Sequence, residues 1–387
     1  MEAYLDNAAT TCPFPQVRDI MMETMKNEYG NPSSLHMKGV NAEQYVKQAR
    51  KVIAKALKVT EKEIIFTSGG TESNNQALIG AAMANHRKGK HIITTKIEHA
   101  SVHNPLLFLE SLGYKISFVS VDKNGHVDMD ELLQLMDDET SIVSIMHVNN
   151  EIGAVEDIEA IGKAIKEKDA SVLFHVDAIQ SFGKFRISPK KCNIDLMSVS
   201  GHKIHGPKGI GFLYIKDKTK INPYIYGGGQ QKGMRSGTEN VPGIAGLGKA
   251  VELIHENHEE KINKLYELKQ YFVEQVEMLP DVHVNGCADM DIRQTAPHVV
   301  SVTTKGVRSE VLLHALEDKG IYVSSGSACS SNHPALSGTL QAIGLPKDEV
   351  ESTIRFSFSV FTTKEELDYA IEAMKELLPV LRKYVRR

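Results

Sequence analysis

Lys203 is the residue of this chain best suited to covalent chemistry. It lies in the segment SVSGHKIHGPKG, residues 198–209, directly after an apolar run over residues 194–199. A lysine amine becomes a nucleophile toward carbonyl groups when burial or a neighbouring cation lowers its pKa, and His202 is adjacent in the sequence. Lys203 is therefore a candidate for holding an aldehyde as a Schiff base. A lone lysine is more often a solvated surface residue, so this hypothesis depends on other segments.

Asp177 ends one such segment. The run FHVD, residues 174–177, is short and mostly apolar before the carboxylate, which is typical of a parallel strand whose carboxyl end points into a site. A carboxylate there suits a buried cation such as the protonated ring nitrogen of pyridoxal 5'-phosphate. A helix cap is the alternative for a single strand-end aspartate. Asp177 followed by Lys203 after a further strand favours the cofactor.

A third segment has the composition of a phosphate cradle. The stretch FTSGGTESNN, residues 66–75, predicts a turn from a strand into a helix, and its glycines, Gly70 among them, let backbone N–H groups approach an anion. The stretch lacks the Gly-Lys-Ser/Thr ending of a Walker loop and is not Gly-x-Gly-x-x-Gly. Taken alone, a plain tight turn is at least as good an interpretation.

Together these segments resemble the fold-type I pyridoxal phosphate enzymes. Their residues are most similar to the motifs of the cysteine desulfurases of the NifS/IscS type. Matching stretches run from YLDNAATT, residues 4–11, to IRFS, residues 354–357, which is nearly the whole chain. The resemblance implies an α/β fold like that of aspartate aminotransferase. Residues 16–255 would form a large domain that binds the cofactor, and residues 1–15 with 256–387 a smaller α+β domain.

The hydrophobic pattern from residue 63 onward agrees with a mostly parallel sheet covered by helices. Short apolar runs alternate with helical patterns. The pattern predicts strands over residues 64–67, 91–95, 115–119, 141–147, 171–176, 194–200, 210–215, 299–303, 322–324 and 353–358. It predicts helices over residues 16–26, 37–57, 71–86, 101–112, 128–137, 157–168, 308–319 and 363–384, and a long helical stretch over 241–278.

The resemblance also implies roles for single residues around the cofactor. It puts His99 over the ring, where a histidine can stack and move protons. It puts Asn150 against the phenolic oxygen or the substrate, although the Asn-Asn pair could simply form a turn. It gives the phosphate Gly70, Thr71, Ser200 and His202, and the ring hydroxyl Gln180. The loop YGNPSSLH, residues 29–36, is expected to line the cleft.

The segment GMRSGTEN, residues 233–240, resembles a loop that reaches across a two-fold axis. In the family its threonine, here Thr238, contacts the phosphate of the partner subunit. The resemblance therefore implies a homodimer. From the sequence alone, an exposed turn is an equally consistent reading of this segment.

Arg355 stands among apolar residues in the predicted strand TIRFS, residues 353–357. A buried guanidinium needs an anionic partner, and its planar fork binds a carboxylate through two hydrogen bonds. The resemblance assigns it to the α-carboxylate of the substrate. A structural salt bridge to an Asp or Glu is the alternative.

Cys329 lies in SSGSACSSNHPALSG, residues 324–338, a polar segment of small residues. A thiolate there can attack the substrate sulfur and carry it away as a persulfide. The other cysteines, Cys12, Cys192 and Cys287, are expected to be buried and inert, as most free cysteines are. Residues 332–338 differ from the motif of those family members that are dedicated to iron–sulfur cluster assembly. The sulfur acceptor could therefore be an iron–sulfur scaffold or a tRNA sulfurtransferase.

The sequence thus predicts an enzyme that converts L-cysteine to L-alanine, with Lys203, His99 and Cys329 as catalytic residues. A selenocysteine lyase is a close alternative. A class V aminotransferase acting on a small amino acid is another, and it would need a keto-acid acceptor but not Cys329. A cofactor-free scaffold protein is disfavoured because every expected cofactor residue is present.

Composition limits the remaining classes of function. At 387 residues the chain is long enough for two domains around a cleft. Its net charge of -4 argues against broad attraction to nucleic acid or to membranes. The four cysteines form no Cys-x-x-Cys pair and no metal-ligand spacing, so no metal site is expected and the thiols are expected to be reduced. A cytoplasmic protein is the resulting expectation.

Overall fold

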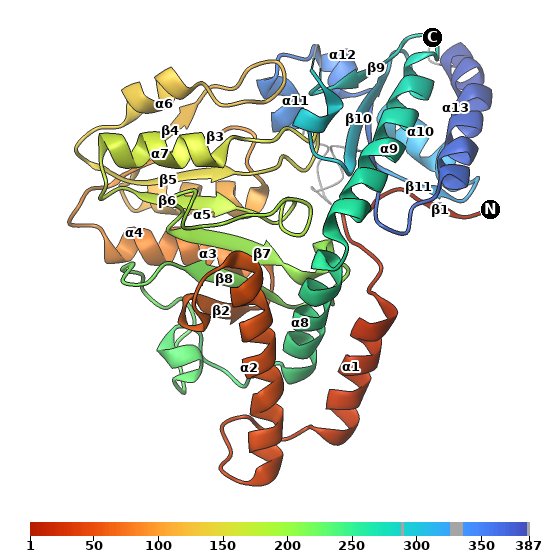
Figure 1. Cartoon of the computed structure of the whole chain (residues 1–387). Coiled ribbons are helices and arrows are strands. Elements are labelled where there is room, and N and C mark those ends of the chain that lie inside the picture. The colour runs from red at the N-terminus through yellow and green to blue at the C-terminus, as the bar shows by residue number, and fades with distance from the viewer. Residues whose placement is uncertain (288–289, 326–335, 385–387) are drawn as a thin grey trace.

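The computed structural model describes residues 1–287, 290–325 and 336–384. Its larger part is built on one seven-stranded sheet (Figure 1). In spatial order the strands are β2 (Ile64–Thr67), β8 (Gly211–Ile215), β7 (Leu196–Ser200), β6 (Leu173–Asp177), β5 (Thr140–Met146), β3 (His91–Thr95) and β4 (Lys115–Val119). The strands from β7 to β4 pair in parallel, whereas β8 is antiparallel to both of its neighbours. The predicted mostly parallel sheet is confirmed.

Helices cover both faces of this sheet because neighbouring residues of its strands are apolar on both sides. In β3, Ile93 packs into one core and Ile92 into another. The first core contains residues of α1 (Pro15–Asn27), α2 (Met37–Leu57), α6 (Met129–Leu135), α7 (Ile158–Lys168) and α8 (Val241–His255). The second contains residues of α4 (Ala81–Ala84) and α5 (Ala100–Ser111).

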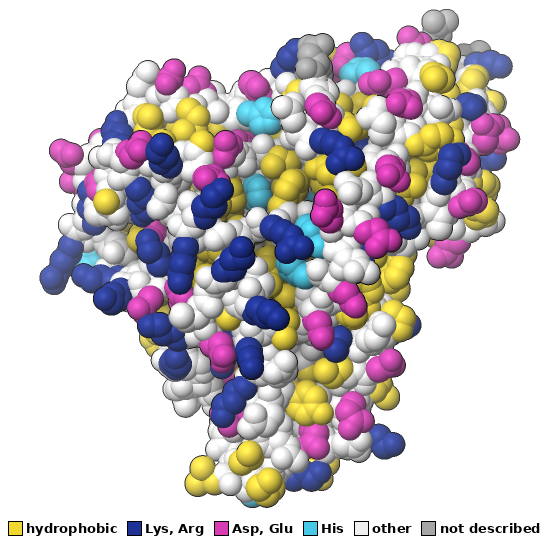
Figure 2. Space-filling view, viewed as in Figure 1, with side chains coloured by type: hydrophobic (Ala, Val, Ile, Leu, Met, Phe, Trp, Pro, Cys, Tyr) yellow, Lys and Arg dark blue, Asp and Glu magenta, His cyan; other side chains and the backbone are white. Residues whose placement is uncertain are grey.

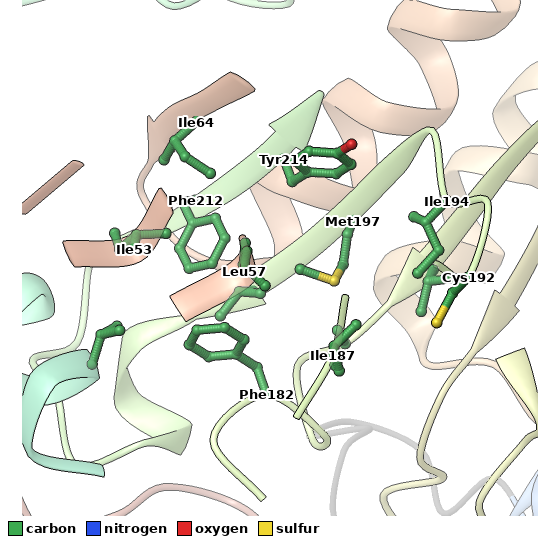
Figure 3. Close-up of a cluster of buried hydrophobic side chains, with 14 of the residues drawn as sticks. Ile53, Leu57, Ile64, Phe182, Ile187, Cys192, Ile194, Met197, Phe212 and Tyr214 are labelled. Carbon is green, nitrogen blue, oxygen red and sulfur yellow. The ribbon is translucent and has the colours of Figure 1, made fainter. Parts of the chain in front are cut away.

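The first core is dense with aromatic and branched side chains. Figure 3 shows Ile53 and Leu57 of α2 beside Phe212 of β8 and Phe182 of the loop after β6. The rings of Phe182 and Phe212 meet edge to face, with their centroids 5.4 Å apart. Edge-to-face contact is a preferred arrangement for aromatic pairs. This packing fixes the loop after β6, which leads toward the site.

The predicted helix over residues 71–86 is divided into three parts. α3 (Gly70–Asn75) leads into a π-helical turn, η2 (Gln76–Gly80), and then into α4. A π-turn makes room for one extra residue in a helix and is frequent near functional sites. Here it follows the segment expected to cradle the phosphate.

The smaller part has a four-stranded antiparallel sheet in the order β12 (Ser324–Ser325), β13 (Thr353–Ser357), β10 (Val299–Thr304) and β9 (Val282–Asn285). It shares a separate core with α9 (His258–Glu277), α10 (Ser309–Glu317) and α13 (Lys364–Tyr384). Two short helices, α11 (Gly338–Ala342) and α12 (Lys347–Val350), lie between β12 and β13 in the sequence. The division of the chain at residues 15/16 and 255/256 stays a prediction.

The N-terminal arm joins the two parts. β1 (Ala3–Tyr4) pairs in parallel with β11 (Ile321–Tyr322), and Asp6 forms a bridge with Ser357 of β13. The next residues cross to the large sheet, where the amide and hydroxyl groups of Thr11 donate to the carbonyl oxygen of His202 at 2.9 and 2.8 Å. The arm therefore runs over the junction between the two sheets.

The three described cysteines differ in burial. Cys192 is buried and Cys287 is partly buried, but Cys12 is exposed, so the expectation that Cys12 is buried is wrong. In the arm it is Phe14, two residues on, that packs into the core, and the Cys12 carbonyl oxygen is bonded to His205 Nδ1 at 2.7 Å. Thr11 and Phe14 are the buried residues of this part of the arm, and the Cys12 thiol lies outside.

Among the described helices, none is long and apolar enough to cross a membrane. The described His, Cys, Asp and Glu side chains form no group of three or more that could hold a metal ion.

Candidate active site

A cavity of about 410 Å³ lies where the arm, the large sheet and β13 meet. Its walls come from the carboxyl ends of parallel strands, which is where α/β sheets bind ligands. The lining residues are Asp6, Ala8, Ala9, Gly70, Thr71, His99, Ser101, Met146, Asn150, Asp177, Ile179, Gln180, Ser200, His202, Lys203, Ser324 and Arg355. The cavity thus brings together nine of the residues predicted to bind the cofactor. It also contains Arg355, the residue predicted to bind the substrate carboxylate. In the sequence these residues are spread over positions 70–355.

Lys203 ends a single 3-10 turn, η3 (Gly201–Lys203), that follows β7 directly. Its Nζ donates to the carbonyl oxygens of Ala8 and Ala9, at 2.6 and 2.7 Å. The arm thus holds the amine within the cavity. The structural alternative of a solvated surface lysine does not apply, because Lys203 is part of the cavity wall.

Asp177, at the end of β6, is 4% exposed. Its Oδ1 accepts from the Ile179 N–H at 2.9 Å, and its Oδ2 accepts from Asn74 Nδ2 at 2.8 Å. Burial raises the pKa of Asp177, whereas these two donors and the nearby His99 and Lys203 lower it. Each carboxylate oxygen has a second lone pair, so Asp177 retains the capacity to accept from a cation in the cavity.

His99 is held by a short chain of hydrogen bonds that leads to Asp177. Its Nδ1 accepts from the Ser101 N–H at 3.1 Å and lies 2.8 Å from Ser101 Oγ. Asn74 Nδ2 donates both to Ser101 Oγ at 2.9 Å and to Asp177 Oδ2. Because an amide N–H can only donate, Nδ1 carries no proton, and the neutral ring has its proton on Nε2. Burial lowers the pKa of His99, which favours this neutral form.

Another group of lining residues consists of small residues and neutral donors. Ser200 ends β7 and is buried, and Gly70 begins α3. A Cβ on Gly70 would lie 2.2 Å from Ile179 Cδ1, so a side chain at position 70 would have to displace Ile179. Burial, with Lys203 nearby, lowers the pKa of His202 to about 4. His202 is therefore a neutral group at neutral pH.

Two amide side chains complete this wall. Gln180 donates to the Ala8 carbonyl oxygen at 2.9 Å, and its Oε1 lies 3.1 Å from His298 Nε2. In the Asn149–Asn150 pair, Asn149 forms the turn, because its Oδ1 accepts from the N–H groups of the two residues after Asn150. The Asn150 side chain is left to line the cavity.

Arg355 combines both roles that the sequence left open. Its Nη2 donates to Asp6 Oδ1 at 2.8 Å, and its Nη1 donates to the Asn150 carbonyl oxygen at 2.9 Å. The guanidinium therefore makes a salt bridge to an aspartate and at the same time lines the cavity. Its Nε is buried and has no partner among the described residues. Each of the two Nη atoms carries a second N–H, so the guanidinium retains donors for a ligand.

Two sequence predictions fall outside this cavity. Thr238 is exposed and does not line it. None of the residues 29–36 lines it either, because this loop joins α1 to α2 at the far end of the helix pair (Figure 1). The expectation that this loop lines the cleft is therefore wrong for the cavity of its own chain. Cys329 lies outside the residues that the structure describes.

Sequence reasoning missed several groups that shape the site. The arm contributes Asp6 and two backbone carbonyl groups, and a backbone group carries no signal in the sequence. Asn74 and Ser101 were also missed, although both lie within four residues of predicted site residues. Their polar character next to those residues was the available signal.

Glu98 is a second buried carboxyl beside Asp177. Its Oε1 accepts from the Met146 N–H at 2.9 Å and from Thr95 Oγ1 at 3.0 Å, but its Oε2 has no partner among the described residues. Burial raises the pKa of Glu98 well above its usual range, and the Asp177 charge raises it further. Donors reach both oxygens of Asp177 but only one of Glu98. The negative charge of the pair is therefore better stabilised on Asp177.

Comparison with known proteins agrees with this geometry. The model of the class-V aminotransferase family matches residues 3–370. The chain belongs to the class-V aminotransferase family. A cysteine desulfurase IscS of Dictyoglomus turgidum is 44% identical over 382 residues, 98% of this chain and 95% of that protein. A cysteine desulfurase of Nostoc sp. is 43% identical and covers 98% of this chain and 93% of its own.

Solved structures are also similar to this chain. A NifS-like protein superposes with a TM-score of 0.92 at 37% identity, covering 98% of this chain and all of that one. SspA, solved in complex with cysteine, superposes with a TM-score of 0.78 at 34% identity, covering 93% of this chain and all of its own. The predicted resemblance to the NifS/IscS-type cysteine desulfurases and the predicted fold are confirmed.

Proposed function

We propose that this chain is a pyridoxal phosphate-dependent cysteine desulfurase whose reaction takes place in the cavity around Lys203. The observation that carries the proposal is the meeting of three groups in one cavity. The Lys203 amine reaches it from η3, the buried Asp177 carboxylate from β6 and the Arg355 guanidinium from β13. The amine suits the aldehyde of the cofactor, the carboxylate suits its protonated ring nitrogen, and the guanidinium suits the carboxylate of an amino-acid substrate.

The cavity fits the cofactor in size and in chemistry. Its volume of about 410 Å³ lies within the range of small-molecule sites. Asp177 has spare acceptor capacity for a ring N–H. Gly70, Thr71, Ser200 and His202 gather at another part of the wall, where a phosphate needs neutral donors. His99 would contact the ring, and Asn150 and Gln180 its oxygen.

When bound, the cofactor supplies an electron sink for the charge that develops at the substrate α-carbon. Asp177 would keep that sink protonated. Lys203 would hold the cofactor through its amine and then move the α-proton, and the His99 Nε2–H would be a second proton donor. Arg355, oriented by Asp6, would bind the α-carboxylate of the substrate and so align the α-carbon with Lys203.

The sulfur step belongs to Cys329. Its thiolate would attack the sulfur of bound L-cysteine, which forms a sulfur–sulfur bond and breaks the carbon–sulfur bond. The electron pair of the broken bond would remain with the carbon, which takes a proton and becomes the methyl group of L-alanine. Cys329 then carries a persulfide. We expect a protein of the iron–sulfur scaffold or tRNA sulfurtransferase kind to accept its sulfur.

A direct test separates this function from an aminotransferase. The purified, cofactor-loaded protein is given L-cysteine with a thiol reductant but without any keto acid. A desulfurase forms alanine and sulfide in equal amounts over many turnovers. An aminotransferase makes no alanine and stops after one half-reaction until a keto acid is added. Selenocysteine in place of cysteine compares the two substrates in the same assay.

We also propose that the active unit is a homodimer, to which Thr238 contributes across the interface. A groove of about 590 Å³ opens beside the cavity and shares Thr71, His99 and Ser101 with it. Its remaining wall is largely apolar, with Ile79, Met83, Pro105, Phe108, Leu112 and Tyr224. Exposed apolar surface of this kind marks interaction sites.

A second apolar surface lies at the free end of the α1–α2 pair. Figure 2 shows apolar side chains gathered there. Met22, Met25, Tyr29, Leu35 and Met37 are all exposed, and Leu35 is fully exposed. In a two-fold dimer each such surface is matched by one on the other copy.

Mixed dimers test the role of Thr238. A Lys203→Ala chain and a Thr238→Ala chain that also lacks Arg235 are each expected to be inactive. After unfolding and refolding together, the heterodimers should regain one intact site each, and activity should return. A fully active monomer in sedimentation would contradict the proposal.

A further inference from the structure

The turn that carries Lys203 is held by residues distant in the sequence. η3 is only three residues long, so its carbonyl groups cannot all be satisfied within the turn. The His202 carbonyl oxygen accepts from the N–H and the hydroxyl of Thr11. The Lys203 carbonyl oxygen accepts from Lys184 Nζ at 2.5 Å. Lys184 is therefore bonded to the peptide of the catalytic lysine itself.

The backbone around Lys184 is fitted closely to this position. Gly183 has a φ of 81°, which favours glycine, and a Cβ on it would lie 3.0 Å from Ile204 Cγ2 and 3.2 Å from Ile254 Cγ1. Ile204 directly follows Lys203 in the chain. The loop after β6 thus packs against the residue after Lys203, which sets the Lys184 amine beneath the turn.

The titratable groups around Lys184 are all bases. The groups that feel its charge are Lys203 in η3, His202 beside it, His205 after the turn and His298 before β10. In the part of the chain that the structure describes, no carboxylate lies within ion-pair distance of the Lys184 amine. Burial, with Lys203 adding to the effect, lowers the pKa of Lys184 to about 7.

We propose that Lys184 is a positioning residue for Lys203, which it holds through the hydrogen bond to the Lys203 carbonyl oxygen. This bond fixes the peptide from which the Lys203 side chain starts. The inference rests on the role of Lys203 in the proposed function.

Three substitutions separate the hydrogen bond from the charge. Lys184→Met keeps the length of the side chain but removes both donor and charge. Lys184→Gln keeps a donor without the charge, and Lys184→Arg keeps both. Lys208→Met serves as the matched control, because Lys208 is an exposed lysine five residues after Lys203.

The first readout uses cofactor-free protein. The rate at which pyridoxal phosphate attaches to Lys203 at pH 7.5 is measured by absorbance. This rate should fall about tenfold in Lys184→Met, since a turn with an unsatisfied carbonyl group is less well fixed. Lys184→Gln and Lys184→Arg, which keep a donor, should recover part of the rate, and Lys208→Met should leave it unchanged.

The second readout uses the loaded enzyme. In Lys184→Met the kcat should fall about tenfold with KM little changed, because the defect is in the catalytic amine and not in substrate binding. Lys184→Gln should recover part of the loss. The proposal is contradicted if Lys184→Met lowers only the melting temperature while the attachment rate and kcat stay at wild-type values. If Lys184→Met does not fold, Lys184→Gln, whose shorter side chain weakens the same hydrogen bond, decides through its attachment rate. Attachment of the cofactor does not depend on the substrate, so failure here is distinguishable from failure of the proposed function.

Discussion

The Arg355 guanidinium donates to the Asp6 carboxylate at 2.8 Å, and this bond ties the N-terminal arm to the sheet of the smaller part. The two side chains are only 11% and 20% exposed. Both line the cavity that contains Lys203. A salt bridge and a substrate clamp are therefore not exclusive roles for Arg355, because one aspartate oxygen occupies a single donor of a guanidinium that has five.

Arg355→Lys should raise the KM for cysteine at least about tenfold, because an ammonium group cannot bind a carboxylate in two places. Asp6→Asn is the matched control, since it weakens the same salt bridge but leaves the guanidinium in place. Its effect on KM should be several times smaller. Steady-state kinetics of both variants check this prediction. Equal effects of the two changes would mean that Arg355 acts through the salt bridge alone.

Asp177→Asn should lower turnover at least about a hundredfold while the cofactor remains bound, because the amide cannot stabilise a protonated ring nitrogen. Glu98→Gln changes a neighbouring buried carboxyl in the same way and should keep most of the activity. Its amide still accepts from Met146 and Thr95. Alanine formation and bound cofactor are measured for both variants. Near-normal turnover in Asp177→Asn would show that another carboxylate serves the ring.

Lys203 should be the residue to which borohydride fixes the cofactor. The reduced protein is digested, and the peptide that carries the cofactor is identified by its absorbance and mass. Lys208→Met should be labelled as wild type is, whereas Lys203→Ala should not be labelled. A label on Lys208 in wild type would overturn the assignment of the catalytic amine.

Acid should destabilise the fold below pH 6.5. Burial lowers the pKa of His147 to about 4 and that of His175 to about 3, so between these values and 6.5 the unfolded chain binds more protons than the folded one. Stability therefore rises with pH across this window. Glu156 opposes the trend, because burial raises its pKa to about 8 and its stabilising proton is lost as the pH rises. The histidines whose pKa is lowered outnumber the carboxyl groups whose pKa is raised, so the net effect is that stability rises with pH.

Urea midpoints at pH 4.5, 5.5 and 6.5 measure this slope. His147→Phe should make the slope shallower, because the ring packs on Phe185 and its Nδ1 has no partner among the described residues. The exposed His314, changed in the same way, should leave the slope as it is. A flat stability profile in wild type, or equal slopes in the two variants, would contradict the prediction.

The sequence predicts the architecture well where apolar periodicity is strong. The helix at residues 37–57 is found at those bounds, and the strands of the parallel sheet are found within two residues. The antiparallel direction of β8 and the four-residue β9 were not predicted. A strand's direction depends on its connections in space. β9 has only two apolar residues, Val282 and Val284, which is too weak a pattern to be recognised.

The site residues also fall into a group that the sequence could predict and a group that it could not. Lys203, Asp177 and His99 are side chains in motifs and could be found, and the family resemblance gave them roles. The carbonyl groups of Ala8 and Ala9 meet the Lys203 amine across more than 190 residues, and only the folded arm brings them there. Lys184 was missed for a related reason. Its partner is a backbone oxygen, so nothing near it in the sequence indicates its position.

The central claim is that Cys329 accepts the sulfur. The most direct test measures alanine formation by Cys329→Ser, together with the peptide masses of the wild-type enzyme after it has reacted with cysteine. Cofactor binding should be intact in the variant, because Lys203, Asp177 and Arg355 are unchanged. Alanine and sulfide formation should fall sharply, since a serine hydroxyl is a poor nucleophile toward sulfur at neutral pH. The wild-type peptide that contains Cys329 should gain one sulfur atom. Alanine formation at the wild-type rate by Cys329→Ser, or the added sulfur on Cys12, Cys192 or Cys287, would contradict the account.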